Sequence, residues 1–216
     1  PMDSELSHFF NGIGMPVLEG YGMTETCAPS SVNPTSGYKI GTIGLPLQGV
    51  AMGVDEEGEL CIKSPAGCAG YHNNPDVTRQ QIVDGWLHTG DIAYYDEDGY
   101  YYIVDRKKDL VIVGGYNVYP REVDEVLYEH PKVAEAVAVG VKHPTRGEVL
   151  KAYVVPRPGE TLTTAELTAH CRARLANYKV PKFFEFREEL PKTIVGKVLR
   201  RALREEEMAK QAKKAA

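Results

Sequence analysis

Four short polar segments of this chain carry residue types that can handle phosphates, ribose hydroxyls and metal ions. They occupy residues 21–25 (YGMTE), 88–91 (HTGD), 105–109 (DRKKD) and 191–197 (PKTIVGK). Each pattern is weak alone, because short polar motifs often occur by chance. Their joint occurrence, each beside an apolar run typical of a strand, points to nucleotide chemistry.

In the first segment, the Thr24 hydroxyl could donate to a phosphate, and Glu25 could hold Mg²⁺ as a hard oxygen ligand. The apolar run at residues 15–18 just before it predicts a buried strand, and loops after strands are common ligand sites in α/β proteins. The alternative is an ordinary turn, in which Gly22 supplies backbone freedom and Thr24 caps a helix. Taken alone, the segment favours the turn.

The second segment predicts a tight turn between two strands, with Gly90 at the turn and Asp91 after it. An acidic side chain held there could accept hydrogen bonds from both hydroxyls of a ribose, or could simply stabilise the turn. His88 receives no role, because no neighbour in the sequence resembles a partner that would orient a catalytic base.

The third segment is a basic cluster, residues 106–108, between Asp105 and Asp109. Such a cluster suits a solvated linker or a site for anionic groups. At a domain junction it could also be a pivot, because a few backbone dihedrals can absorb a large rotation. The following pair Gly114 and Gly115 would either let a ligand approach the backbone closely or form a tight turn.

The fourth segment ends at Lys197, on a predicted loop that leads into the terminal helix. A lysine on such a loop can neutralise charge that develops on a phosphate during acyl or phosphoryl transfer. The segment is a poor match to a phosphate-binding P-loop, which needs an upstream glycine and a following Ser or Thr. Taken alone, Lys197 would be read as a surface lysine.

The first half of the chain must position two of these segments with mostly short strands. Gly and Pro punctuate apolar stretches between residues 37 and 64, which predicts a small meander or barrel of strands. The other expected elements are helices at 4–10 and 77–82 and strands at 86–88, 92–95 and 100–104.

The composition changes at residues 105–109, and we place a domain boundary there, between domains 1–105 and 106–216. The second domain is expected to be compact, with a three-stranded sheet and three helices. Strand patterns occur at 110–113, 133–141, 148–155 and 183–187, and helix patterns at 120–129, 163–175 and 199–214. The predicted fold class is therefore α+β.

Composition excludes several classes of protein. The 216 residues are 43% hydrophobic, and 25 basic against 30 acidic residues give a net charge of −5, so no nucleic-acid-binding role is expected. The four cysteines lack the close pairing of a zinc site or a disulfide framework. With no signal peptide or transmembrane stretch, we expect a cytoplasmic protein, at most peripheral to a membrane.

Taken together, these motifs resemble the C-terminal portion of adenylate-forming (AMP-binding) enzymes, and the chain is most similar to bacterial long- or medium-chain fatty acyl-CoA synthetases. The resemblance covers nearly the whole chain and is carried by residues 16–26, 41–44, 84–91 and 190–200. It implies an acid–thiol ligase. Such an enzyme joins a carboxylic acid to ATP, giving acyl-AMP and pyrophosphate, and then passes the acyl group to coenzyme A.

The resemblance also implies roles for the nucleotide-binding residues. Thr24 would contact the α-phosphate, and Glu25 would bind Mg²⁺. Tyr21, with Gly22, would lie at the adenine. Asp91 and Arg106 would hold the ribose. These six residues are expected to form one site for ATP and AMP.

Three further roles follow from the same resemblance. Lys197 would bridge the carboxylate and α-phosphate oxygens during adenylation. Lys108 would be the hinge about which the C-terminal domain rotates afterwards. That rotation would withdraw Lys197 and bring Gly114 and Gly115 to the tunnel for the pantetheine arm of coenzyme A.

The chain departs from the family pattern, because the upstream phosphate loop and most of the acyl pocket are absent. We therefore expect a fragment that is inactive alone, exposes apolar surface on residues 1–104, and could form a homodimer through it. Two alternatives stay open: an adenylation module for another acid or a carrier protein, and a non-catalytic domain that binds a nucleotide or a partner. The sequence does not reveal the acyl-chain length.

Overall fold

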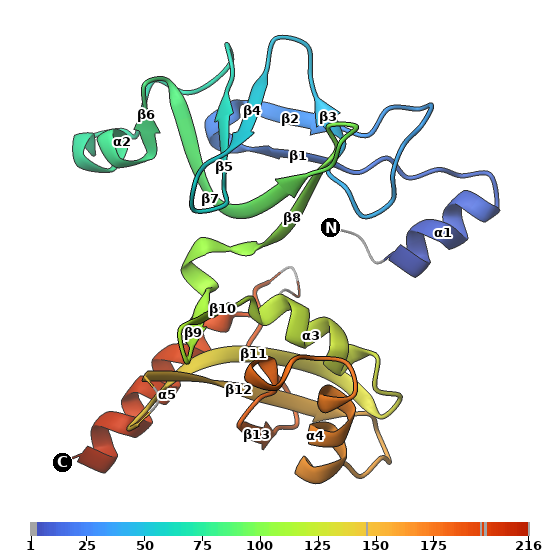
Figure 1. Ribbon diagram of the computed structural model, residues 1–216, viewed down its shortest axis with the longest axis vertical. Helices are drawn as coiled ribbons and strands as arrows, with labels where there is room; N and C mark the ends of the chain where they lie inside the picture. Colours follow the sequence, from blue (N-terminus) through green and yellow to red (C-terminus); the bar gives the residue numbers. More distant parts are fainter. Residues whose placement is uncertain (1–3, 146, 195, 197, 216) are drawn as a thin grey trace. The chain divides into compact units, whose positions relative to one another are not determined.

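The computed structural model describes residues 4–145, 147–194, 196 and 198–215, and the chain divides into two compact units, Pro1–Lys107 and Lys108–Ala216. The boundary expected after residue 105 lies two residues before this division. Figure 1 shows the elements of each unit.

In its described residues, 4–107, the first unit combines two helices, a 3-10 turn and two antiparallel sheets. One sheet has the order β1-β2-β3, and the other has the order β4-β5-β7-β6 with β8 also paired to β7. The elements are α1 (Ser4–Gly12), β1 (Gly20–Met23), η1 (Thr24–Thr26), β2 (Ala28–Val32), β3 (Leu45–Pro46), β4 (Ala51–Val54), β5 (Glu59–Lys63), α2 (Pro75–Gln81), β6 (Ile82–Val83), β7 (Trp86–Tyr95) and β8 (Tyr101–Arg106). Both sheets are open, so no closed barrel forms among the described residues, and the strands expected at 37–64 divide between the sheets, with β3 in one and the β4–β5 hairpin in the other.

The core of this unit lies against the strands β5, β7 and β8. Its most buried members are Leu60, Ile62, Ala93 and Tyr101, together with Ile43 from the loop before β3. Gly44 is required beside Ile43, because a Cβ there would lie 2.1 Å from the Val32 carbonyl carbon. Gly44 therefore allows the loop before β3 to lie close to the end of β2.

Two sequence predictions are wrong in this unit. Residues 15–18 do not form a buried strand: no ladder pairs them among the described residues, and Met15 is 61% exposed. Pro16 lacks the N–H that a paired strand needs on both edges. The predicted turn at Gly90 is also absent, because β7 runs without a break from Trp86 to Tyr95 and Gly90 sits at a positive φ of 75° inside it.

The second unit is a five-stranded sheet with three helices. The sheet has the order β10-β9-β12-β11, with β13 paired in parallel to β12. The elements are η2 (Lys107–Asp109), which spans the boundary, β9 (Val111–Val113), β10 (Tyr116–Val118), α3 (Pro120–Tyr128), β11 (Val133–His143), β12 (Gly147–Pro156), α4 (Thr164–Arg172), η3 (Asn177–Lys179), β13 (Phe183–Phe186) and α5 (Arg200–Ala215). The mixed α+β fold class is confirmed, but the expected count of three strands is wrong.

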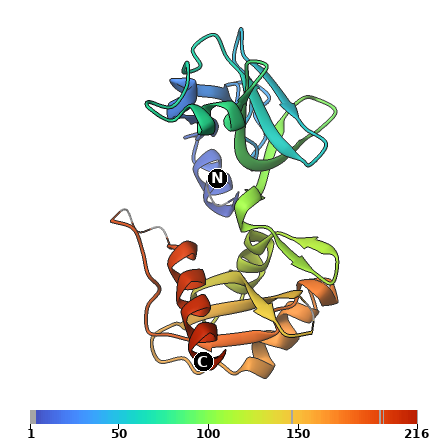
Figure 2. The ribbon, with the colours of Figure 1, turned by 90° about the vertical axis from the view of Figure 1, so that its left-hand side faces the viewer.

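Both faces of this sheet are covered, because successive apolar residues of β11 point to opposite faces. Ala136 and Ala138 face a core that includes Leu127 of α3 and Leu167 of α4. The intervening Val137, Val139 and Val141 join a second core with Tyr153 and Leu203 of α5. Figure 2 shows α5 (red) running beside the sheet. Continuous apolar runs in β11 and β12 are thus explained by burial on both sides.

None of the described helices combines the length and hydrophobicity needed to cross a lipid bilayer.

Candidate functional site

Three of the predicted nucleotide-binding residues converge in the first unit. Tyr21 on β1 donates a hydrogen bond from its hydroxyl to Asp91 Oδ2 at 2.5 Å. Arg106, at the end of β8, pairs in register with Asp91 on β7, and its Nε lies 3.8 Å from Asp91 Oδ1. Residues separated by 70 positions in the sequence are therefore brought to one carboxylate.

The Asp91 carboxylate remains partly accessible to solvent. The side chain of Asp91 is 18% exposed and that of Arg106 is 53% exposed. Burial raises the pKa of Tyr21, and the neighbouring Asp91 raises it further, so Tyr21 stays a neutral hydrogen-bond donor. The cluster thus offers a carboxylate acceptor, a guanidinium donor and an aromatic ring, which suits a hydroxylated ligand with a planar base.

A buried glutamate supports the backbone beside Asp91. Glu59 on β5 has a side chain only 7% exposed, and its Oε1 accepts a hydrogen bond from the Gly90 N–H at 2.8 Å. Its Oε2 lies 2.8 Å from Lys107 Nζ. Burial would raise the pKa of Glu59, but Lys107 and Gly90 outweigh it and lower the pKa. No sequence motif marks Glu59, because its partners are distant along the chain.

The predicted phosphate and metal residues lie on the 3-10 turn η1, directly after β1. Thr24 is exposed, and the Glu25 carboxylate accepts a hydrogen bond from the Tyr71 hydroxyl at 3.0 Å. Burial, then Glu25, raises the pKa of Tyr71, which keeps this hydroxyl protonated. The helix-cap alternative does not hold for Thr24, since Met23 is the residue that precedes η1 and Thr24 is its first residue.

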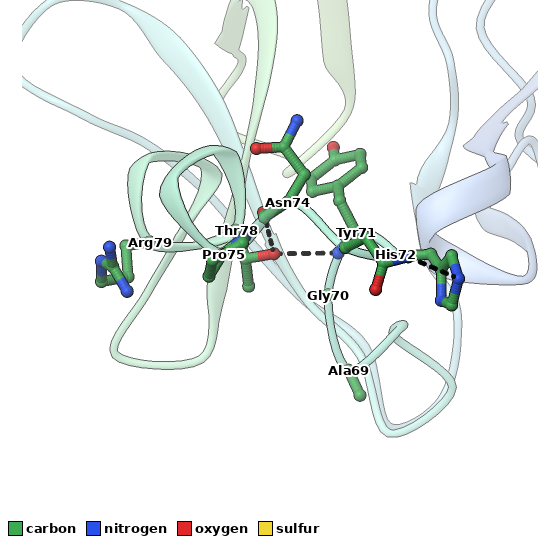
Figure 3. Close-up of a pocket in the computed structure, with 9 residues that line it drawn as sticks. Ala69, Gly70, Tyr71, His72, Asn74, Pro75, Thr78 and Arg79 are labelled. Carbon is green, nitrogen blue, oxygen red and sulfur yellow. Dashed lines mark hydrogen bonds between the residues drawn. The ribbon is translucent and has the colours of Figure 1, made fainter.

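Tyr71 belongs to a shallow surface pocket of about 600 Å³ formed by residues 69–75 with Thr78 and Arg79 of α2. The Thr78 hydroxyl holds the loop, accepting a bond from the Tyr71 N–H at 2.9 Å and donating to the Asn74 carbonyl at 3.0 Å (Figure 3). This fixes Tyr71, which lies 46 positions from Glu25 in the sequence. Tyr71 therefore positions the proposed metal ligand, although no motif marks it.

Steric reasons account for three predicted glycines. A Cβ on Gly22 would lie 2.5 Å from the Ala28 carbonyl oxygen of the paired strand β2. Gly114 and Gly115, with φ of 59° and 87°, form the two-residue turn between β9 and β10. Both positive angles belong to a type I′ hairpin, which glycine adopts without strain. The tight-turn alternative therefore holds for this pair, and their proposed approach to coenzyme A stays a prediction.

The boundary between the units lies at the peptide bond from Lys107 to Lys108. Lys107 Nζ is tied to the first unit, 2.6 Å from Glu57 and 2.8 Å from Glu59. The Lys108 carbonyl is tied to the second unit, where it accepts a hydrogen bond from Arg204 Nη1 of α5 at 2.9 Å. The contacts therefore change from the first unit to the second between Lys107 and Lys108, and the hinge role of Lys108 stays a prediction.

Arg204 also fixes the residue after the joint. Its Nη2 lies 2.8 Å from Asp109 Oδ1, and Arg200 Nη1 lies 3.8 Å from Asp109 Oδ2. The Asp109 side chain is only 10% exposed, so these guanidinium groups compensate a largely buried charge.

Lys197, the central catalytic prediction, lies outside the described residues. Around it, Lys192 and Val198 form an antiparallel bridge, and the Leu199 N–H donates to the Pro191 carbonyl at 2.7 Å. Ile194 is fully exposed. The described part of this segment is therefore a closed loop presented to solvent, directly before α5.

Family models of AMP-binding enzymes match both units. The model described as "AMP-binding enzyme" matches residues 1–72, and the model described as "AMP-binding enzyme C-terminal domain" matches residues 122–197. The chain belongs to the AMP-binding enzyme family. The expected resemblance to adenylate-forming enzymes is thereby confirmed.

Curated relatives of the family are named as CoA ligases for different acids. The chain is 48% identical over 206 residues to a long-chain-fatty-acid–CoA ligase of Bacillus subtilis, covering 90% of this chain and 37% of that protein. It is 46% identical over 205 residues to a 2-succinylbenzoate–CoA ligase of Bacillus cereus, covering 89% of this chain and 42% of that protein. The chain therefore spans well under half the length of these relatives.

A solved structure of the family shares the fold. It is the o-succinylbenzoate CoA synthetase of Bacillus subtilis in complex with its acyl-adenylate intermediate, with a TM-score of 0.85 and 36% identity over 94% of this chain and 44% of that chain. The same enzyme has been solved with ATP and a magnesium ion.

Proposed function

We propose that this chain is the C-terminal part of a fatty acid–CoA ligase. In this proposal the whole enzyme adenylates a carboxylic acid with ATP, releases pyrophosphate, and transfers the acyl group to the thiol of coenzyme A. Residues 1–107 are the end of the large AMP-binding domain, and residues 108–216 are its mobile lid. The chain alone is inactive, and the whole enzyme is cytoplasmic.

The observation that carries this proposal is the convergence of Tyr21, Asp91 and Arg106. Asp91 accepts one hydrogen bond from Tyr21 and lies within 4 Å of Arg106, yet keeps acceptor capacity toward solvent. A carboxylate so placed can receive the two hydroxyls of a ribose, while the Tyr21 ring lies against the adenine. We assign these three residues to the binding of AMP and ATP. Gly22 has no side chain, so it allows the backbone next to Tyr21 to lie close to the paired strand β2.

The residues of η1 fit a magnesium-dependent phosphate site. Glu25 offers the hard carboxylate oxygen that Mg²⁺ prefers, and Tyr71 orients it through a 3.0 Å hydrogen bond. Thr24, one residue earlier and exposed, is free to donate to the α-phosphate. When bound, Mg²⁺ offsets the negative charge of the phosphates. Glu25 would hold it, and Thr24 would orient the phosphate.

Lys197 supplies the remaining positive charge in this proposal. A substrate carboxylate and the α-phosphate are both anions and repel each other, so a cation between them lowers the barrier to attack. After adenylation, rotation at Lys108 would carry Lys197 away and present the β9–β10 turn at Gly114 and Gly115 to the pantetheine arm. One mobile domain would then serve both half-reactions.

The test uses a full-length protein that contains this chain. We expect Lys197→Ala to slow pyrophosphate release by roughly 100-fold or more, because a preorganised electrostatic contact is typically worth that much. Lys192→Ala is the matched control, since Lys192 is on the same loop but pairs with Glu135. An unchanged rate in Lys197→Ala would support a non-catalytic domain instead.

The identity of the acid needs a separate assay. The relatives above are named as ligases of long-chain fatty acids or of 2-succinylbenzoate, and the chain is nearly equally similar to both, at 48% and 46% identity. We propose a fatty acid, on the strength of the seven fatty-acid ligases among the relatives at 46% to 51% identity. Pyrophosphate release measured with a series of acyl chains, 2-succinylbenzoate and other acids would decide. Exchanging coenzyme A for a carrier protein tests the remaining alternative.

A further inference from the structure

A cluster of metal-binding side chains lies at one end of the β4–β5 hairpin, apart from the residues assigned to the nucleotide. It consists of Asp55 from the hairpin turn, Cys61 on β5 and His88 on β7, whose ligand atoms all lie within 4.8 Å of one another. Cys61 and His88 are directly opposite each other in the antiparallel register of β5 and β7, so their side chains share one face of the sheet.

The distances match those between ligands of a single ion. His88 Nδ1 lies 3.5 Å from Cys61 Sγ and 3.8 Å from Asp55 Oδ2. Two ligands of one tetrahedral Zn²⁺ lie about 3.5 Å apart when the metal–ligand bonds are about 2.0–2.3 Å long. Both distances to His88 are thus close to this spacing, and the third pair, Asp55 and Cys61, lies within 4.8 Å, so the three atoms could close around one ion by side-chain adjustment.

Three polar groups converge on one nitrogen of His88. Glu59 Oε2 lies 3.4 Å from the same Nδ1 atom, so a thiol sulfur and two carboxylate oxygens surround it. An imidazole nitrogen makes one ordinary hydrogen bond, as donor or as acceptor of the thiol proton, so it cannot pair with all three groups at once. A cation in this space would accept lone pairs from the sulfur, the nitrogen and a carboxylate oxygen together.

The turn holds Asp55 ready for this role. Asp55 Oδ1 accepts hydrogen bonds from the Glu57 N–H at 2.9 Å and the Glu59 N–H at 2.8 Å. Its Oδ2 is thereby directed to His88. The side chains of Asp55 and His88 are 28% and 27% exposed, which leaves a route for an ion, while Cys61 is buried.

The charges also balance for a divalent ion. Glu59 is already compensated by Lys107 at 2.8 Å, so it forms a wall of the site rather than a ligand. The ligand set is then one carboxylate, one thiolate and one neutral imidazole, with two negative charges in total. Thiolate and imidazole select borderline or soft metals such as Zn²⁺ and Co²⁺ over Mg²⁺ and Ca²⁺.

We propose that Asp55, Cys61 and His88 form a binding site for a thiophilic divalent metal ion such as Zn²⁺, distinct from the magnesium site at Glu25. Binding releases the thiol proton to solvent, because the thiolate is the ligand, and leaves a fourth position for water. This site does not depend on the proposed ligase activity.

The test is a Co²⁺ titration of the reduced 216-residue chain, followed by displacement with Zn²⁺. We expect one equivalent to bind with thiolate-to-cobalt charge-transfer absorption, and Zn²⁺ to abolish that absorption. Cys61→Ser and His88→Gln should weaken binding at least about 10-fold, and Cys61→Ser should remove the charge-transfer band. The matched controls Cys68→Ser and His72→Gln should leave both unchanged.

A change at the buried Cys61 could disturb the fold, so Asp55→Asn provides an independent arm. Asparagine keeps the Oδ1 acceptor for the turn but loses the charge that the ion needs. We expect Asp55→Asn to bind Co²⁺ at least about 10-fold more weakly, with an unchanged unfolding temperature. The proposal is overturned if binding does not saturate at one equivalent, if Asp55→Asn binds as tightly as the parent chain, or if the spectrum depends on Cys68.

Discussion

At the scale of single residues, the candidate nucleotide site depends on how fully its charges are compensated. Asp91 receives one short hydrogen bond from a neutral Tyr21, while its guanidinium neighbour Arg106 lies at 3.8 Å, beyond hydrogen-bonding distance. Glu59, by contrast, has both oxygens engaged by Gly90 and Lys107. The partly engaged carboxylate is the one that faces solvent, as a ligand-binding group should.

The first residue-scale prediction concerns Asp91→Asn in a full-length protein. We expect the KM for ATP to rise by roughly 10-fold to 100-fold, because hydrogen bonds to a charged group are worth about 1.5–3 kcal/mol. ATP titrations of pyrophosphate release would measure it. Tyr21→Phe is the comparison variant, since it keeps the ring but loses the hydrogen bond to Asp91. Equal KM values in Asp91→Asn and the parent enzyme would refute the ribose assignment.

At the scale of elements, local sequence patterns predicted individual helices and strands well, but they did not predict which distant strands pair with each other. The helix α3 begins at Pro120 as expected, because proline at the first turn and the apolar spacing are local signals. The strand β10 was missed because it is only three residues long, Tyr116–Val118, and α3 begins two residues later. The error at residues 15–18 has the opposite cause: an apolar run indicates burial but does not supply a partner strand.

The candidate site residues also divide into those that a local motif marks and those that only long-range contacts identify. The four polar segments marked Tyr21, Asp91 and Arg106, whose convergence the structure then displayed. Tyr71 and Glu59 carry no local signal, since each acts through a partner at least 31 positions away, Glu25 in one case and Gly90 in the other. Only the fold brings such supporting residues into view.

The hinge prediction belongs to this scale. In a full-length protein, Lys108→Pro should slow thioester formation more than adenylation, because proline fixes φ near −65° and restricts rotation without touching the nucleotide site. Lys108→Ala is the control, since it removes the side chain and keeps the backbone freedom. Single-turnover measurements of pyrophosphate release and of acyl-CoA formation would separate the steps. Equal loss of both would count against a hinge.

The ion network beneath α5 gives a pH prediction. Burial would raise the pKa of Glu185 on β13, but Lys151, Arg187 and Lys210 outweigh it and lower the pKa from 4.5 to about 2. A carboxylate with a depressed pKa in the folded state stabilises the fold above its unfolded pKa, and that stabilisation disappears as pH falls through the folded value. The second unit should therefore lose stability between about pH 4.5 and pH 2.

The fully buried Cys171 in the same unit provides the readout. We expect its labelling by a pyridyl disulfide, which reacts at acid pH, to accelerate as pH falls over this range in the parent chain. Glu185→Gln should label faster than the parent at pH 7, and the difference should shrink toward pH 2. Glu188→Gln, on an exposed neighbour, is the control. A constant difference at all pH values would contradict the assignment to Glu185.

At the scale of the whole molecule, α1 and the segment after it present large apolar side chains to solvent. Phe9 is 60% exposed, Ile13 55% and Met15 61%. Large apolar side chains gathered in one short stretch usually mark a surface that contacts another protein segment. The chain spans only 37% of the Bacillus subtilis ligase. Under the proposed function, the rest of the whole enzyme would be available to cover this surface.

The corresponding prediction is that the 216-residue chain self-associates through this surface, which includes the homodimer expected from the sequence. Sedimentation velocity over a range of concentrations should show dimers or larger species. The double variant Phe9→Glu and Met15→Glu should shift the distribution to monomer, because two charges would have to be desolvated on association. Ile112→Glu, at a 52% exposed apolar residue of the second unit, is the control. A concentration-independent monomer in the parent chain would refute the prediction.

The ties on either side of the bond from Lys107 to Lys108 have one more consequence. The ammonium of Lys107 pairs with two glutamates of the first unit, and the carbonyl of Lys108 accepts a hydrogen bond from an arginine of the second unit. If Lys108 is the hinge, rotation there should give one orientation of the second unit for each half-reaction. Dyes attached to the two halves of a full-length ligase should then report distinct populations of energy-transfer efficiency, whose proportions change when ATP or acyl-AMP is added.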